Sequence, residues 1–135
     1  MTRDITSALW RFWGQFTLDG VAIQAYQTGT VTEDASFPYV TFEAPRAASM
    51  GTMPLTAYLW TRYAGENSAS AIAQRLAWFE AVEQAIPEGG VKLPLPVGFL
   101  MIHRGSGDFL YPGTDEEDKT VLFARVGYEC TYYTT

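Results

Sequence analysis

Cysteine and histidine are nearly missing from this sequence, with one residue of each, Cys130 and His103. A single cysteine forms no intrachain disulfide and cannot supply the thiolate set of a zinc site. A Ser-His-Asp triad would have to use His103 with Asp108 or Asp115 as the orienting acid, and a histidine at a strand end is the simpler interpretation. We therefore expect no catalytic residue, no metal site and no cofactor, and the prediction is a protein that is not an enzyme.

Charged residues are also few, at 18% of the chain, and Lys+Arg number 9 against 15 Asp+Glu, a net charge of -6. A groove for nucleic acid needs a basic surface, which this composition does not supply over the whole chain. No apolar run approaches the roughly 18 residues of a membrane span, and the N-terminus lacks the apolar segment of a signal peptide. The sequence thus predicts a soluble, intracellular protein with no membrane partner.

Aromatic residues, in contrast, are abundant, at 15% of the chain. They favour strands and are typical of contact surfaces. The 135 residues match the length of one domain. We expect a single domain over residues 1–135 with a large share of β-strand.

Two segments have the apolar period of amphipathic helices. The first has the stripe Ile5, Ala8, Leu9, Phe12, Trp13 and Phe16. The second, predicted over 69–86, has the stripe Ile72, Leu76, Phe79, Val82 and Ile86. Strands are predicted over 21–26, 37–43, 52–63, 91–93, 97–103 and 119–133, with polar loops over 27–36 and 105–118. The order α-β-β-β-α-β-β-β predicts an α+β two-layer sandwich, in which both helices pack on one face of a largely antiparallel or mixed sheet.

The two longest predicted strands carry large side chains on the face away from the helices. These residues are Tyr58, Trp60, Val121 and Phe123, and Trp78 lies beside the main stripe of the second helix. Aromatic side chains with arginine nearby are typical anchors of protein–protein contacts. We predict that these five residues form a subunit interface. The alternative is that they cap the edges of the core or lie scattered on the surface.

The predicted loop 105–118 ends in an acidic run, Asp115, Glu116, Glu117 and Asp118. Carboxylates alone can hold a hard cation, but this spacing does not match a calcium-binding EF-hand loop. A solvated acidic loop is the simpler interpretation. We predict that this run faces the lumen of an assembly or a neighbouring subunit.

In its order of motifs, the chain resembles the tail-terminator and tail-completion proteins of long-tailed bacteriophages, also described as minor tail or minor capsid proteins. After the N-terminal helix, the motifs that carry the resemblance are the segments 37–42 (FPYVTF), 59–62 (LWTR), 89–93 (GGVKL) and 104–106 (RGS), then the acidic loop and the aromatic closing strand. The chain departs from the family pattern after Ser106, where Gly107-Asp108-Phe109 stand in place of a continuation that contains proline.

This resemblance implies a structural virion protein that assembles as a homo-oligomeric ring, commonly a hexamer. Such a ring caps the major tail tube protein, ends tube polymerisation and joins the tail to the connector of the head. It implies a location in the tail or neck of the virion, and in the host cytoplasm during assembly. DNA would pass through without specific binding, which agrees with the acidic charge of the chain.

Two other functions stay open. The first is another neck component, a head–tail stopper or adaptor, which belongs to the same structural class but has a different neighbour. The second is a small ligand-binding or enzymatic α+β domain, which would need a concave pocket with convergent polar groups.

Overall fold

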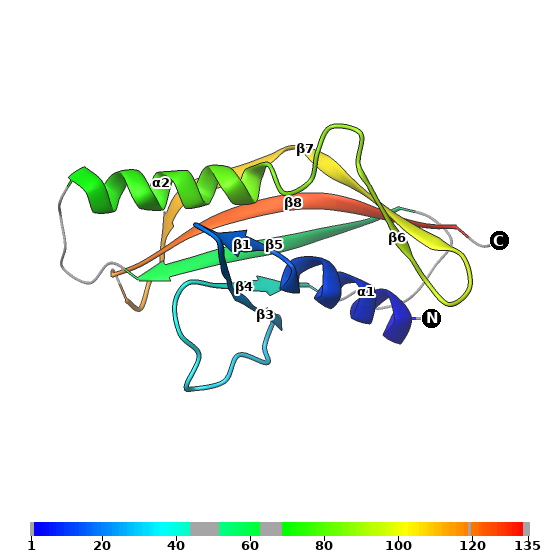
Figure 1. Ribbon diagram of the computed structural model, residues 1–135, viewed down its shortest axis with the longest axis horizontal. Helices are drawn as coiled ribbons and strands as arrows, with labels where there is room; N and C mark the ends of the chain where they lie inside the picture. The colour runs from blue at the N-terminus through cyan, green and yellow to red at the C-terminus, as the bar shows by residue number, and fades with distance from the viewer. Residues whose placement is uncertain (1, 44–51, 63–68, 119, 134–135) are drawn as a thin grey trace.

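The computed structural model of this chain describes residues 2–43, 52–62, 69–118 and 120–133 (Figure 1). Its helices and strands are, in chain order, α1 (Thr2–Gly14), β1 (Thr17–Leu18), β2 (Val21–Ala22), β3 (Gln24–Gln27), β4 (Tyr39–Phe42), β5 (Thr52–Arg62), α2 (Ala69–Glu83), β6 (Val91–Pro94), β7 (Phe99–Thr114) and β8 (Val121–Tyr133). The α+β class is confirmed. The order of elements differs from the predicted one, because residues 17–22 form an additional ladder of two short strands.

The main sheet has six strands in the order β3-β4-β5-β8-β7-β6. Its strand directions are mixed, since β3 and β4 pair in parallel and the other described pairs are antiparallel. The long connection over 28–38 permits the parallel pair, because parallel neighbours cannot be joined by a tight hairpin. α1 contacts β3 and β4 at one edge and β6 at the other, so the sheet curls around this helix (Figure 1). The two-layer sandwich stays a prediction.

The inward face of the sheet and both helices share one buried cluster of side chains. From α1 come Leu9 and Trp13, which are fully buried as the helical period predicts. The Trp13 ring lies 5.9 Å from the Tyr128 ring of β8, and its Nε1 donates a hydrogen bond of 3.4 Å to the Tyr128 hydroxyl. From α2 come Phe79 and Val82. The same cluster therefore holds both helices against the sheet.

The centre of the sheet is the long ladder of β5 and β8, which runs from the pair Thr52–Thr131 to the pair Arg62–Val121. Burial alternates along β5 as predicted, with Leu55, Ala57 and Leu59 pointing inward. β4 pairs only with residues 57–60 of β5, so β5 is an edge strand at Pro54 on that side. A residue without an N–H is tolerated at such a place.

The predicted loop over 105–118 is wrong for most of its length, because β7 continues to Thr114. The ladder between β7 and β8 has register shifts between Arg104 and Phe109 and between Leu110 and Gly113. Glycines inside a strand often mark such bulges. The glycine-rich sequence that indicated a loop thus belongs to an irregular strand, and the loop proper begins at Asp115.

The apolar stripe predicted for the second helix is only partly confirmed. Phe79, Val82 and Ile86 are buried, whereas Ile72 and Leu76 are each 41% exposed. The described core cluster reaches only the second half of α2, so the first half of the stripe is left at the surface. No helix in the described part of the chain has both the length and the apolar character needed to cross a bilayer.

Candidate functional site

The outward face of β4, β5 and β8 gathers aromatic side chains from three strands. Tyr39 pairs with Trp60 across β4 and β5, and Trp60 pairs with Phe123 across β5 and β8. Directly paired residues point to the same face of a sheet, so these rings lie beside one another. The even positions Tyr58 and Trp60 on β5 alternate with the buried, inward Leu59. The predicted outward position of Tyr58, Trp60 and Phe123 is borne out by this register.

Short ring-to-ring distances form two groups of three residues: Tyr26, Phe37 and Tyr39, and Tyr58, Trp60 and Phe123. The direct pairing of Tyr39 with Trp60 places the two groups side by side, and we call the six residues together the aromatic array. Tyr58 and Trp60 are stacked with centroids 5.4 Å apart. Phe123 lies 5.4 Å from Tyr58 and 5.0 Å from Trp60. The Trp60 Nε1 donates a hydrogen bond of 2.9 Å to the Thr41 hydroxyl, which orients the indole on the sheet.

At β7 the array ends on a glycine. A Cβ at Gly113 would come within 2.4 Å of the Phe123 ring, so this ring lies directly over the Gly113 backbone. Val121, the neighbouring predicted interface residue, is only 5% exposed. Phe123 and Val121 are thus positioned by packing within the chain, while the Phe123 ring stays partly exposed.

A hollow of about 250 Å³ opens beside the array, between β4, β5 and the loops on either side of them. Its lining includes the rings of Phe37, Tyr39 and Trp60 together with Asp115 of the acidic run. Burial raises the pKa of the Tyr39 hydroxyl, the nearby positive charge of Arg62 opposes this, and the negative charge of Asp115 adds to it. The hollow therefore combines aromatic walls with a carboxylate.

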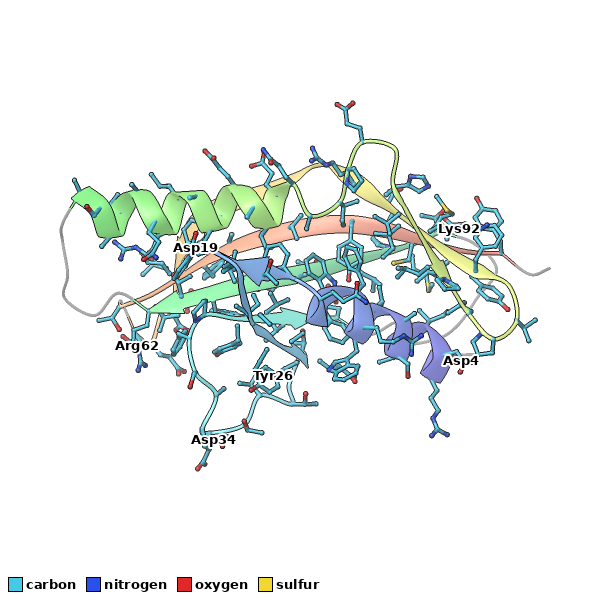
Figure 2. All side chains as sticks on the ribbon, in the orientation of Figure 1. Asp4, Asp19, Tyr26, Asp34, Arg62 and Lys92 are labelled. Carbon is cyan, nitrogen blue, oxygen red and sulfur yellow. The ribbon has the colours of Figure 1, made fainter. Side chains whose placement is uncertain are left out.

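Arg62, at the end of β5, ties the array to the acidic run. Its guanidinium lies 4.8 Å from the centre of the Phe37 ring and 3.2 Å from Asp118 Oδ2. Both members of the ion pair are half-exposed, so the pair adds little stability by itself. Figure 2 shows Arg62 at the far end of the sheet from Lys92, whose Nζ lies 4.3 Å from the centre of the Phe99 ring.

The four acidic residues of the run have two different roles. Asp115 Oδ1 accepts a hydrogen bond of 2.8 Å from the Glu117 N–H. Asp118 Oδ1 accepts bonds from the Thr120 hydroxyl and N–H, which hold the pKa of Asp118 below its usual value, with a smaller contribution from Arg62. Glu116 and Glu117 are exposed. The aspartates thus shape the turn, while the glutamates present charge to the surroundings.

Trp78 lies apart from the aromatic array. It belongs to α2, which packs on the inward side of the sheet, and its ring is partly buried against the core. Its Nε1 donates a hydrogen bond of 2.8 Å to Asp19 Oδ2, and Gln74 Nε2 donates one of 3.2 Å to the same oxygen. This tryptophan joins α2 to the turn between β1 and β2, and its predicted role in a subunit interface stays a prediction.

Sequence reasoning missed the part of the array that β3 and β4 supply. The alternation of 37–43 was a signal that could have found two of these residues, because Phe37 and Tyr39 fall on one face and the buried Val40 falls on the other. Tyr26 had no comparable signal, because it meets Tyr39 only through the parallel pairing of β3 and β4, with ring centroids 5.7 Å apart.

The residues considered for catalysis lie apart. His103 is exposed, and Asp115 follows the other end of β7, roughly 20–25 Å away at about 3.3 Å per paired residue. The side chain of Asp108 lies outside those described. Burial raises the pKa of the Cys130 thiol to about 12, which makes it a poor nucleophile near neutral pH. In the described ranges, no group of three His, Cys, Asp or Glu side chains is placed to hold a metal ion.

No protein-family model matches this sequence, and the comparisons with curated proteins and with solved structures found no match.

Proposed function

We propose that this chain is a structural virion protein of a long-tailed bacteriophage. It assembles as a ring, a hexamer according to the family resemblance, caps the major tail tube protein, ends tube polymerisation and joins the tail to the head connector. The observation that supports this most is the aromatic array on the outward face of the sheet. Both helices share a buried cluster with the inward-facing side chains of the sheet, and the proposal takes the outward array to be available to a second protein surface.

Aromatic side chains of this kind are effective anchors because they bury large areas with little loss of conformational freedom. The rings of Tyr58, Trp60 and Phe123 are held in place by stacking and by the Trp60–Thr41 hydrogen bond. A preorganised surface loses less entropy when it binds. In a ring, each copy uses one surface to meet a different surface of the next copy, and the array is the surface that we assign to one side of this contact.

The acidic run fits the same function. Glu116 and Glu117 are exposed at the tip of a turn that Asp115 and Asp118 shape. Carboxylates along a DNA channel repel phosphates and let the DNA slide without specific binding. The proposal therefore places these glutamates at the lumen or at a neighbouring subunit, in the virion neck and, before that, in the host cytoplasm. The two-layer sandwich remains part of this proposal.

The test of the proposal is assembly on tail tubes. Purified protein should bind the open end of tubes built from the major tail tube protein, stop their growth and be visible there as a ring by electron microscopy. Phe123→Ser and Tyr58→Ser should remove capping while circular dichroism shows a folded chain. Tyr133→Ser, an exposed aromatic residue outside the array, is the matched control and should still cap.

Binding to a portal-side adaptor in place of the tube would assign the chain to the stopper or adaptor class instead. Unchanged capping by both array variants would remove the array from the interface.

A further inference from the structure

Two surfaces on opposite layers of the molecule are complementary in chemistry, and the inference drawn from them rests on the proposed ring. One is the hollow beside the aromatic array, on the outward face of the sheet. The other is the exposed side of α1, which lies on the inward side, where Trp13 packs against β8. The two surfaces adjoin at the edge strand β3, where Trp10 and Tyr26 line one hollow, whereas Arg11 and Asp115 are not paired with each other within the chain. A head-to-tail contact between copies can bring these two surfaces together.

The hollow has the features of a site for an organic cation. Its volume of about 250 Å³ suits a single side chain, and Phe37, Tyr39 and Trp60 present aromatic rings to it. Aromatic walls attract guanidinium and ammonium groups through the negative faces of the rings. Asp115 adds a carboxylate, and no cation lies within ion-pair distance of it among the residues described. Arg62 of the same chain illustrates this attraction at the rim of the hollow, where its guanidinium lies over the Phe37 ring.

The exposed side of α1 carries the matching groups. Trp10 is 56% exposed, the largest such value among the aromatic side chains described as exposed. Arg11 lies next to it and is also exposed, and both residues line a shallow hollow of about 350 Å³ against β3. Within the described ranges, Arg11 has no carboxylate within ion-pair distance. Asp4, the acidic residue of α1, lies two turns away at the other end of the helix.

We propose that the Arg11 guanidinium of one copy enters the hollow of Phe37, Tyr39, Trp60 and Asp115 on the next copy, with Trp10 packing on the surrounding surface. The cation then exchanges water for aromatic faces and a carboxylate, which strengthens the attraction as the contact excludes solvent. The chain as a whole is acidic, at -6, so copies repel one another in general. A local cation placed in an acidic, aromatic hollow gives these copies one favoured orientation.

Cross-linking of two single-site variants tests the contact even when self-association is weak. Cys130 is buried, so a surface cysteine reacts selectively. Ser7→Cys lies one turn before Arg11 on α1, and Thr28→Cys lies at the rim of the hollow. A concentrated mixture of the two variants should give disulfide-linked heterodimers under mild oxidation. Each variant alone should give far fewer homodimers, because the contact joins two different surfaces.

Charge changes then identify the ion pair. Arg11→Glu should weaken self-association by roughly thirtyfold or more, the effect on affinity that is typical of losing one partner of a desolvated charge pair. The yield of cross-linked heterodimer should fall with it. Asp115→Asn keeps the oxygen that accepts the Glu117 N–H and should weaken association in the same way. The double variant that combines Arg11→Asp with Asp115→Arg should recover part of the lost self-association. Lys92→Glu makes the same charge change at the end of the sheet far from Arg62 and the hollow, on a side chain that lies over the Phe99 ring, and should have little effect (Figure 2).

Each outcome supports or overturns the proposed contact between Arg11 and the hollow. Heterodimers that depend on Arg11 and Asp115 support the proposal. Rings that still form and cap tubes, with no effect of Arg11→Glu and no heterodimers, overturn this contact and leave the proposed function standing. Failure to cap tubes by the unaltered protein overturns the proposed function itself. Stabilisation by tetramethylammonium with no heterodimers would assign the hollow to a small cation and would also overturn the contact.

Discussion

Phe123 lies across the backbone of Gly113, and this close approach explains why a glycine stands in the middle of a paired strand. The two residues are partners in the ladder of β7 and β8. A side chain on the outward face at 113 would displace the ring from its contacts with Tyr58 and Trp60. The glycine therefore permits the aromatic array to reach a fifth strand, β7.

We expect Gly113→Ala to lower the free energy of unfolding by about 1–3 kcal/mol, because the new methyl group overpacks the site. Urea unfolding followed by fluorescence measures the change. Gly14→Ala is the control, since no atom lies within 4 Å of its added Cβ, and it should change stability by less than about 1 kcal/mol. Equal effects of the two substitutions would contradict the close approach.

Cys130 determines part of the response to alkaline pH. Burial raises the pKa of its thiol from 9.0 to about 12, so the folded state keeps the thiol neutral while the unfolded state ionises. A raised pKa of an acid gives stability that is complete below the unfolded value and is lost as pH rises toward the folded one. The free energy of unfolding should fall by about 1.4 kcal/mol per pH unit between pH 9 and 12 from this group.

Chemical denaturation at a series of pH values measures this slope. Burial also raises the pKa of the Tyr128 hydroxyl, so the slope of the unaltered protein steepens further above pH 10. Cys130→Ala should be less stable at neutral pH but should lose less stability on going from pH 9 to pH 12. An identical slope in the variant would show that the thiol ionises without cost in the folded state.

α2 contributes to the core unevenly along its length. Phe79 is 1% exposed, whereas Leu76, less than one turn earlier, is 41% exposed. Trp78 is held between these two environments by its hydrogen bond to Asp19 in the turn between β1 and β2. The helix is therefore fixed by its second half and by this turn.

Truncating these two side chains should separate their contributions. Phe79→Ala removes a ring from the core and should cost about 3–5 kcal/mol of stability. Leu76→Ala should cost about 0.5 kcal/mol or less, because much of the side chain is already in water. Thermal and urea unfolding of both variants measure the difference. A large loss of stability from Leu76→Ala would show that the exposed first half of the apolar stripe of α2 is covered by another surface in solution.

At the scale of the whole molecule, the sheet is stabilised from its centre outward. β5 and β8 pair over the full length of β5, and both contribute to the buried cluster beneath the helices. β3 and β6 are short edge strands, which lie against α1 where the sheet curls. Opening of an edge strand exposes fewer buried contacts than opening of the centre.

Native-state hydrogen exchange should follow this order. Amides of β5 and β8 that lie in the shared ladder should exchange most slowly, near the rate of global unfolding, and those of β3 and β6 should exchange faster. Mass spectrometry of exchanged peptides resolves the strands. Protection of β3 that rises on assembly would further agree with a contact next to α1. Slowest exchange in β6 would contradict the assigned centre.

Local patterning by itself determined the helical stripe of α1 and the two faces of β5. Leu9 and Trp13 recur at helical spacing, and Tyr58 and Trp60 alternate with Leu59, so each residue's side follows from its neighbours in the chain. The α+β class followed from the same periods. The proposal that the outward face is an interface also began there, because an unpartnered aromatic face is visible in the alternation.

Only the tertiary structure decided what depends on contacts between distant segments. The parallel pairing of β3 with β4 brings Tyr26 to the array, the bulged strand β7 replaces the predicted loop, and Asp115 reaches the hollow beside Trp60. Glycine favours a turn and a bulge equally, and a short strand does not encode its partner. Such choices are made by long-range packing, where the free energy of the whole sheet outweighs the preference of any single segment.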